Sequence, residues 1–208
     1  MNSISVTKDG KMKILAVADQ ESPYIWDYFD KENFKDIDLV ISCGDLKASY
    51  LSFIVTMIPV PLLYVNGNHD TSYLRKPPEG CTCIEDTIFE YKGLRIGGLG
   101  GSMEYTGGPF QHTECSMRKR VKKLTKLATK KGGLDILVTH SPTFGIGDGD
   151  DLCHRGFESF KSIYETFSPR YHLHGHQHLN YNFHTKRIAS YNSTTIINTF
   201  NYYILEVN

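Results

Sequence analysis

Short apolar runs alternate with amphipathic stretches along the first third of the chain, and each run ends in polar residues. The runs at 13–18, 37–42 and 60–65 are typical of buried strands. They lead into Asp19, into Gly44-Asp45, and into the segment 66–70. Helices are predicted between them, one opening at Ser22-Pro23 and one over 48–57. Because ligands bind beyond the carboxyl ends of the strands in parallel α/β sheets, these polar strand ends indicate a functional site.

The second half of the chain predicts further strands, two polar loops and two helices. The longest helix is expected over 113–130, where Gly132-Gly133 ends it. A second helix is expected over 157–167, and polar, glycine-rich loops over 100–111 and 145–151. The expected strands are 81–91, 94–98, 134–138, 195–198 and 202–207. With no internal repeat, we expect a single domain over 1–208.

Composition and charge narrow the class of protein. Hydrophobic residues make up 40% of the chain and charged residues 22%, as in an ordinary globular protein. The 23 Lys+Arg balance the 23 Asp+Glu, so nucleic acid is not an expected partner. The five cysteines are odd in number and lack zinc-site spacing, which favours a reducing compartment. The polar N-terminus and the prolines within the most apolar stretch, 53–65, predict a cytoplasmic protein with no membrane association.

The polar strand ends carry carboxylates, imidazoles and an amide, which are ligands of divalent transition metals. Four motifs follow apolar runs in order along the chain: Gly44-Asp45, Gly67-Asn68-His69-Asp70, Thr139-His140 and Gly175-His176-Gln177-His178. This order resembles the calcineurin-like metallophosphoesterase superfamily, whose motifs are D-x-H, G-D, G-N-H-D/E, H and G-H-x-H. All but the first are present as written, and the resemblance spans residues 13–178. It implies an α/β fold, a four-layer α/β/β/α sandwich of two mixed sheets flanked by helices.

The resemblance also implies a site with two divalent metal ions bridged by Asp45. One ion would be held by Asp19, the residue at position 21 and His178, and the other by Asn68, His140 and His176. Two such ions activate a water and clamp the attacking and leaving oxygens of a phosphate ester. His69 would contact the phosphate or protonate the leaving oxygen. Asp70 would orient His69 through the other nitrogen of its ring.

The first motif departs from the family pattern, because Asp19-Gln20-Glu21 has Glu21 where the family has histidine. Glu21 is either a carboxylate ligand, which we favour, or a residue outside the ligand set that leaves the first metal with too few ligands. If Asp19, Glu21 and Asp45 are all ionised, the total charge of these carboxylates, two divalent ions and a hydroxide is zero. We therefore expect weaker attraction for anionic substrates and a preference for Mn²⁺ or Fe²⁺, with Zn²⁺, Mg²⁺ and Ni²⁺ as alternatives.

Three further features lie outside these motifs. In the loop after His140, His154 is a candidate substrate contact, because Asp151, His154 and Gly156-Phe157 resemble a pattern in bacterial relatives; a solvated turn is the alternative. The basic residues of 118–131 are interpreted as the solvated face of an amphipathic helix, with a phosphate-binding patch as the alternative. We interpret His172 and His174 as structural neighbours of the site.

The expected function is a metal-dependent phosphoesterase that hydrolyses a phosphomonoester or phosphodiester by a dimetal-activated water. The presence of His69 favours an enzyme, specifically a phosphodiesterase or phosphatase. The alternative is a phosphoesterase-like binding or scaffold module without turnover, which the Glu21 substitution favours. A nucleic-acid phosphodiesterase that uses the basic helix is a weaker third hypothesis.

Overall fold

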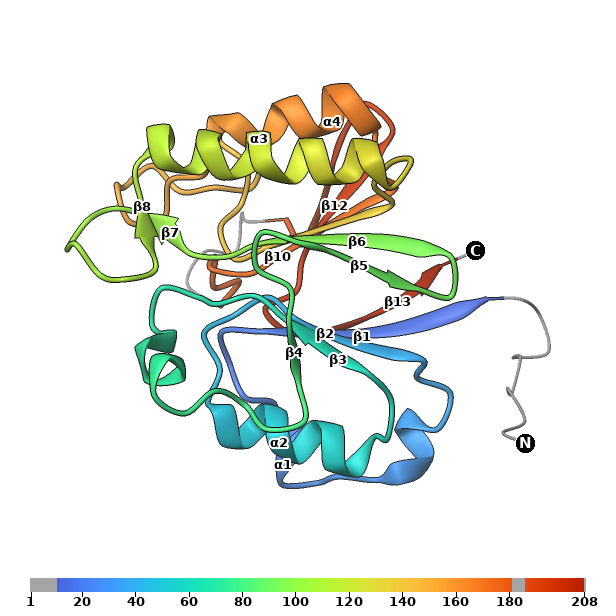
Figure 1. Cartoon of the computed structure of the whole chain (residues 1–208). Coiled ribbons are helices and arrows are strands. Elements are labelled where there is room, and N and C mark those ends of the chain that lie inside the picture. The colour runs from blue at the N-terminus through green and yellow to red at the C-terminus, as the bar shows by residue number, and fades with distance from the viewer. Residues whose placement is uncertain (1–10, 181–185, 208) are drawn as a thin grey trace.

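In the computed structural model, which describes residues 11–180 and 186–207, two β-sheets pack between two layers of helices (Figure 1). The chain therefore has the four-layer α/β sandwich expected from the motifs. In spatial order, the strands of the first sheet are β13 (Asn201–Val207), β1 (Met12–Ala18), β2 (Leu39–Ser42), β3 (Leu62–Tyr64) and β4 (Thr82–Cys83). Strands β1 to β4 are parallel, and β13 runs antiparallel to β1.

The second sheet is also mixed, with parallel strands at its centre and antiparallel strands at both edges. Its strands, in spatial order, are β11 (Ile188–Tyr191), β12 (Thr194–Asn198), β10 (Tyr171–His174), β9 (Ile136–Thr139), β6 (Leu94–Leu99) and β5 (Ile88–Tyr91). Strands β12, β10, β9 and β6 are parallel. A separate parallel pair, β7 (Ser102–Met103) and β8 (Gln111–His112), lies in the loop after β6.

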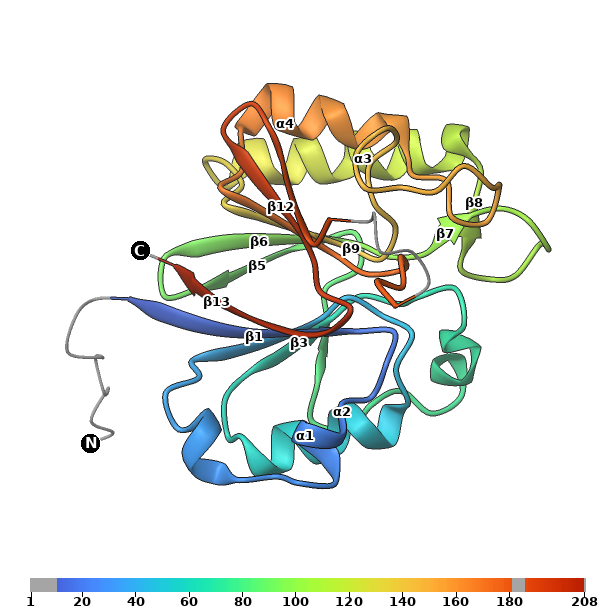
Figure 2. The ribbon, with the colours of Figure 1, turned by 180° about the vertical axis from the view of Figure 1, so that it is seen from behind.

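Helices cover the outer face of each sheet, as the front and back views show (Figures 1 and 2). Helices α1 (Pro23–Trp26) and α2 (Ala48–Met57) cover the first sheet, and α3 (Glu114–Lys130) and α4 (Lys161–Phe167) cover the second. The remaining helical segments are 3₁₀ turns: η1 (Lys31–Phe34), η2 (Asp70–Leu74) and η3 (Glu158–Phe160). None of the helices in the described ranges is long and apolar enough to cross a bilayer.

Strand β1 shows how the sequence builds the layers. Its side chains alternate between the two faces of the strand. Ile14, Ala16 and Ala18 pack in the core between the two sheets, while Leu15 and Val17 pack against the helices below. Because both faces are buried from Ile14 to Ala18, this part of the strand is apolar throughout, which is the pattern that predicted it.

Three segments differ from the expectation. Residues 81–91 do not form one strand: β4 ends the first sheet, the chain crosses over, and β5 begins the second. The loop 100–111 contains the β7 and β8 pairing. Residues 157–167 form η3 followed by a shorter α4. The local sequence predicted a strand over 81–91, a loop over 100–111 and a helix over 157–167, but pairing and packing with distant segments decided their form.

Candidate metal centre

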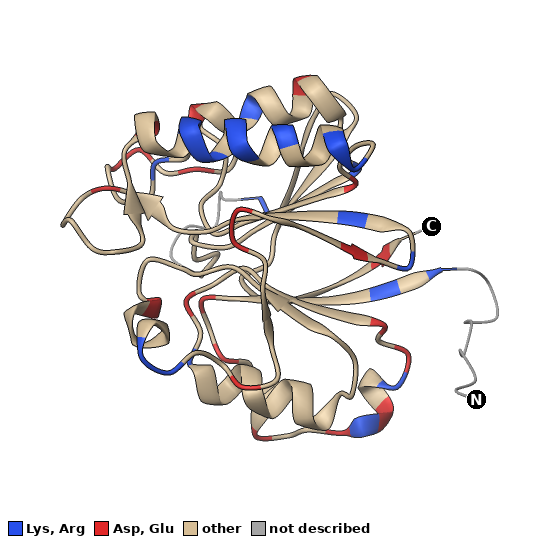
Figure 3. Cartoon of the chain, in the orientation of Figure 1, with Lys and Arg blue, Asp and Glu red and all other residues tan. Residues whose placement is uncertain are grey.

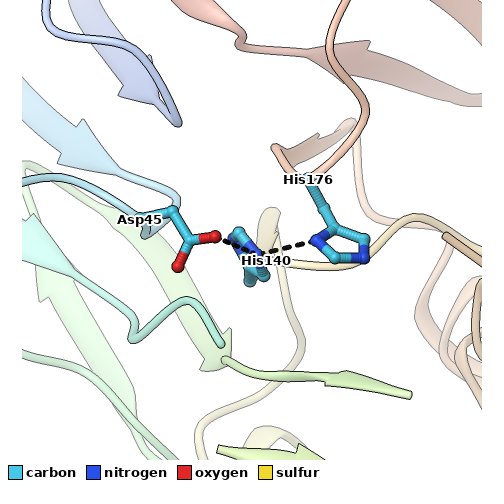
Figure 4. Close-up of side chains that lie close together, drawn as sticks. All are labelled: Asp45, His140 and His176. Atoms are coloured by element: carbon cyan, nitrogen blue, oxygen red, sulfur yellow. Dashed lines mark hydrogen bonds and ion pairs between the residues drawn. The ribbon is translucent and has the colours of Figure 1, made fainter. Parts of the chain in front are cut away.

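The carboxyl ends of β2, β9 and β10 bring three metal-ligating side chains together. Asp45, His140 and His176 point toward one another, and a donor atom of each lies within 4.8 Å of the others (Figure 4). Nε2 of His140 is at the centre, 3.3 Å from Oδ2 of Asp45 and 3.0 Å from Nδ1 of His176. One carboxylate and two imidazoles suit a divalent transition metal.

Asn68 joins this group from the end of β3. Its Oδ1 lies 2.9 Å from the same Nε2 of His140, and its Nδ2 donates to the Tyr105 hydroxyl at 3.0 Å. Tyr105 thereby orients the amide so that the oxygen faces His140. A single ring nitrogen thus faces three potential acceptors, although one N–H makes only one well-aligned hydrogen bond. A cation bound between these side chains would contact four donor atoms: Nε2 of His140, Oδ2 of Asp45, Oδ1 of Asn68 and Nδ1 of His176.

The outward nitrogens of the two imidazoles are held by backbone carbonyls. Nδ1 of His140 donates to the Cys43 carbonyl at 2.8 Å, and Nε2 of His176 donates to the Cys153 carbonyl at 2.5 Å. With the outer N–H held in this way, the inner nitrogen of each ring can offer its lone pair to a cation once it carries no proton, as in histidines that bind metals. The donor set therefore fits a bound cation.

Asp19 and His178 lie beside this group. Oδ1 of Asp19 is 3.9 Å from Nε2 of His178, and the Asp19 carboxylate accepts from the backbone N–H of His176 at 2.9 Å. These two side chains adjoin the first group, as an adjacent second cation position requires. The structure thus brings together six predicted ligands from five strand ends: Asp19, Asp45, Asn68, His140, His176 and His178.

The charges of the buried side chains also favour the binding of a cation. Burial raises the pKa of Asp19 to about 7. Burial opposes ionisation of Asp45 too, but His140 and the His69 backbone N–H lower its pKa to about 2. Burial would lower the pKa of His140, yet Asp45 and Asp19 raise it to about 9. The proton on His140 balances the carboxylates here, and a divalent ion would replace it.

The backbone around the ligands is strained. Asp19, Asp45 and His176 have φ values of 63°, 58° and 68°, a left-handed region that non-glycine residues seldom adopt. Such strain is concentrated at functional sites, where the surrounding structure maintains it. Gly67 is required by close approach, since a Cβ there would lie 2.0 Å from Oδ1 of Asp45. These features fix the ligand positions before any ion binds.

A family model for calcineurin-like phosphoesterases matches residues 12–180, which is most of the chain. The chain belongs to the calcineurin-like phosphoesterase family. The family uses divalent metals to act on phosphate esters, in agreement with the donor set described above.

Two solved structures share the fold. One matches at a TM-score of 0.67 and 15% identity, covering 94% of this chain and 95% of the other. The protein TT1561 of Thermus thermophilus matches at 0.64 and 16% identity, covering 91% and 89%. Vps29 of Chaetomium thermophilum gives 0.41 and 14%, covering 90% and 70%. No curated protein is similar enough to the chain to count as a match.

Asp70 contacts different groups from those that the family motif led us to expect. Its Oδ2 accepts from the backbone N–H groups of Gly67 and Asp45 at 2.7 and 2.9 Å. It therefore holds two metal-site loops together, and its hydrogen bonds among the described residues do not include the His69 ring. The His69 backbone N–H donates to Oδ1 of Asp45 at 2.7 Å, and its side chain is exposed at the edge of the centre.

Glu21, the departure from the family pattern, does not join the group around His140. Its carboxylate forms an ion pair with Lys47, with Oε1 and Nζ 3.4 Å apart. Lys47 is two residues after Asp45 in the sequence, and its side chain is exposed. No motif signalled Lys47, because a lysine on a loop has no characteristic spacing.

His154 lies at the other side of the centre. Its ring centroid is 5.4 Å from that of His176, and its Nδ1 lies 2.8 Å from Oδ2 of Asp151. Gln177 also binds this loop, donating to the His154 carbonyl at 2.7 Å. The loop is therefore attached to the metal-site segment 175–178 at several points, including the Cys153 carbonyl.

The basic helix holds one residue with an unexpected role. The lysines of α3 are exposed, and Figure 3 shows the basic positions of this helix in blue. Arg120, in contrast, is largely buried and pairs with Glu85 and Asp86. Glu85 in turn accepts from the backbone N–H groups of Asn66 and Gly100 at 2.8 and 3.0 Å. Arg120 thus supports the loop that carries Asn68. Helical spacing could not separate this arginine from its solvated neighbours.

Proposed function

We propose that this protein is a hydrolase of phosphomonoesters or phosphodiesters that uses two divalent metal ions. The observation that carries the proposal is the convergence of Asp45, Asn68 and His176 on one nitrogen of His140. Oxygen and nitrogen donors without a thiolate favour Mn²⁺ or Fe²⁺.

The ligand assignment follows the family motifs. Asp45 would bridge the two ions, with Asn68, His140 and His176 on one ion and Asp19 and His178 on the other. Glu21 would complete the second set by exchanging its ion pair with Lys47 for the cation. When bound, the ions supply a water of lowered pKa and positive charge for the phosphoryl oxygens.

The residues of the chain would divide the remaining work. His69 is exposed beside Asp45, where its ring can donate a proton or hydrogen bond to the leaving oxygen. His154, oriented by Asp151, can donate to a phosphoryl oxygen from the side of His176. The carboxylate of Asp70 would keep the two loops in register during this reaction.

The test is hydrolysis of a chromogenic phosphodiester beside its monoester, with Mn²⁺ or Fe²⁺ and with Asp45→Ala as the control. We expect turnover that depends on metal and is lost in Asp45→Ala, and the ratio of the two rates identifies the preferred ester. Asp36→Ala, at an exposed carboxylate outside the centre, is expected to keep the full rate. Bound metal without turnover of either ester would favour a non-catalytic binding module, for which the Glu21 substitution is the sequence feature in support.

A further inference from the structure

A pocket of about 400 Å³ is lined by residues of β7, the start of α3 and the loop 144–158. Figure 1 shows where these segments lie in the fold. Its size is within the range of small-molecule sites. Apolar side chains of Met103, Phe144 and Leu152 line it, together with the charged side chains of Glu114, Arg155 and Glu158.

Two walls of this pocket are formed by segments that hydrogen-bond to ligands of the metal centre. One wall includes Leu152 and Arg155, and Cys153, one of the two residues between them, accepts a hydrogen bond from His176 through its carbonyl. The other includes Met103 on β7, close to Tyr105, whose hydroxyl accepts from Asn68. A phosphate ester held at the metal centre would therefore have this pocket beside it.

Arg155 is the charged group of the pocket that has no ion-pair partner among the described residues. Its guanidinium lies over the Phe144 ring, 4.7 Å from the centroid. The carboxylate of Glu114 accepts from the backbone N–H groups of Glu158 and Ser159 at 3.1 and 3.0 Å and is paired with Arg118 at 3.9 Å. Glu158 is paired with Lys161 at 3.1 Å. The pocket thus offers one uncompensated positive charge on an aromatic surface.

Resting on the proposed function, we infer that this pocket binds the organic group of the ester, and that Arg155 selects esters whose organic group carries a second anion. An apolar or aromatic body would contact Met103, Phe144 and Leu152. The anion, a carboxylate or a second phosphate, would pair with the Arg155 guanidinium, whose planar fork matches either group. Leu152 is 56% exposed, an apolar side chain that such a body would cover.

Binding of two matched phosphonates to the Mn²⁺-loaded protein tests this inference without requiring turnover. 4-Carboxyphenylphosphonate carries the second anion, and 4-carbamoylphenylphosphonate has nearly the same shape without it. Because a partly exposed ion pair contributes modestly, we expect the wild type to bind the carboxylate about fivefold more tightly. Arg155→Met is expected to bring the ratio of the two affinities to about one, and Arg155→Glu to invert it.

Lys122→Met is the matched control. It also removes one positive charge, but from α3 and outside the pocket, so it should keep the wild-type ratio of the two affinities. Equal affinities in the wild type, a preference that persists in Arg155→Met, or no binding of either phosphonate would overturn the inference. The corresponding phosphate esters separate the two proposals. Binding preference without hydrolysis would refute the proposed activity and leave the pocket assignment standing, whereas hydrolysis without preference would do the reverse.

Discussion

The backbone N–H of His176 lies 2.9 Å from both carboxylate oxygens of Asp19, a contact that joins the two sheets at the metal centre. Asp19 follows β1 of the first sheet, and His176 follows β10 of the second. Gly175 allows this approach, since a Cβ there would lie 2.6 Å from Oδ2 of Asp19. The Asp19 carboxylate therefore has a structural role in addition to its expected role as a ligand.

This contact predicts different effects for two substitutions at position 19. Asp19→Ala removes the acceptor and places alanine at a φ of 63°, so it should lower the free energy of unfolding by about 2 kcal/mol. Asp19→Asn keeps an acceptor and tolerates this backbone, so the loss should be below about 1 kcal/mol. Urea unfolding of the metal-free protein at pH 6 measures both. Equal losses would contradict the structural role.

Replacing Glu21 with histidine should change metal selectivity. Glu21→His restores the imidazole of the family motif, and imidazole suits Zn²⁺ better than a carboxylate does. We expect affinity for Zn²⁺ to rise relative to Mn²⁺ in metal titrations. Unchanged affinity and selectivity would place Glu21 outside the ligand set.

Lys47→Met separates ligation from ion pairing at the same position. It breaks the 3.4 Å pair with Glu21 but removes no candidate ligand. If Glu21 binds metal, this variant should bind Mn²⁺ at least as tightly as the wild type, because the carboxylate loses a competing cation. Weaker binding would indicate that the ion pair itself maintains the site.

Arg120 should be the most sensitive basic residue of α3. Its side chain is only 16% exposed, and Arg120→Met would leave the carboxylate of Glu85 without its cation and Asp86 with only the longer 3.9 Å pair to Lys123. We expect a loss of about 2–3 kcal/mol in the free energy of unfolding, measured by urea titration. Arg118→Met, on the exposed side of the same helix, should cost less than about 0.5 kcal/mol. Similar losses in both variants would contradict the inward network.

His172 should make the metal-free protein less stable in acid. It is buried with its ring nitrogens near the Tyr164 and Thr139 hydroxyls, and burial holds its pKa well below 6.5. The unfolded chain gains a proton below pH 6.5 that the folded state does not take. As the pH is lowered below 6.5, this residue therefore decreases the free energy of unfolding by about 1.4 kcal/mol per pH unit.

The measurement is the slope of stability between pH 6 and pH 5. His172→Gln cannot take up this proton, so its slope should be shallower than that of the wild type by about one proton. Tyr164→Phe keeps the imidazole and should keep the wild-type slope. Identical slopes for wild type and His172→Gln would show that His172 is protonated in the folded protein.

The fold and the ligand cluster were predictable because their signals are local. A buried strand followed by a turn with a ligand is a contiguous pattern, and five such segments direct their ends to one edge. Helix α3 was also predicted closely, since Thr113 caps it and Gly132-Gly133 follows it. In contrast, the crossover at 84–87 depends on strand pairing far along the chain, which residues 81–91 do not encode by themselves.

The roles of individual polar side chains were less predictable than their positions. Asp70 was expected to contact its neighbour His69, but it binds the backbone of Gly67 and Asp45. Arg120 gave no signal, because a charged residue that faces inward has the same sequence spacing as one that faces water, and Lys47 gave none because it is an exposed loop lysine. Their roles depend on the partners that the tertiary fold supplies.

Strand β13 determines when the first sheet can be completed. It pairs with β1 along the full length of both strands, from Met12 with Val207 to Ala18 with Asn201. A nascent chain that has not yet released β13 from the ribosome therefore exposes one edge of β1, the strand that leads to Asp19. During synthesis that edge is open to pairing with other chains, so shielding by a chaperone would matter most for this strand.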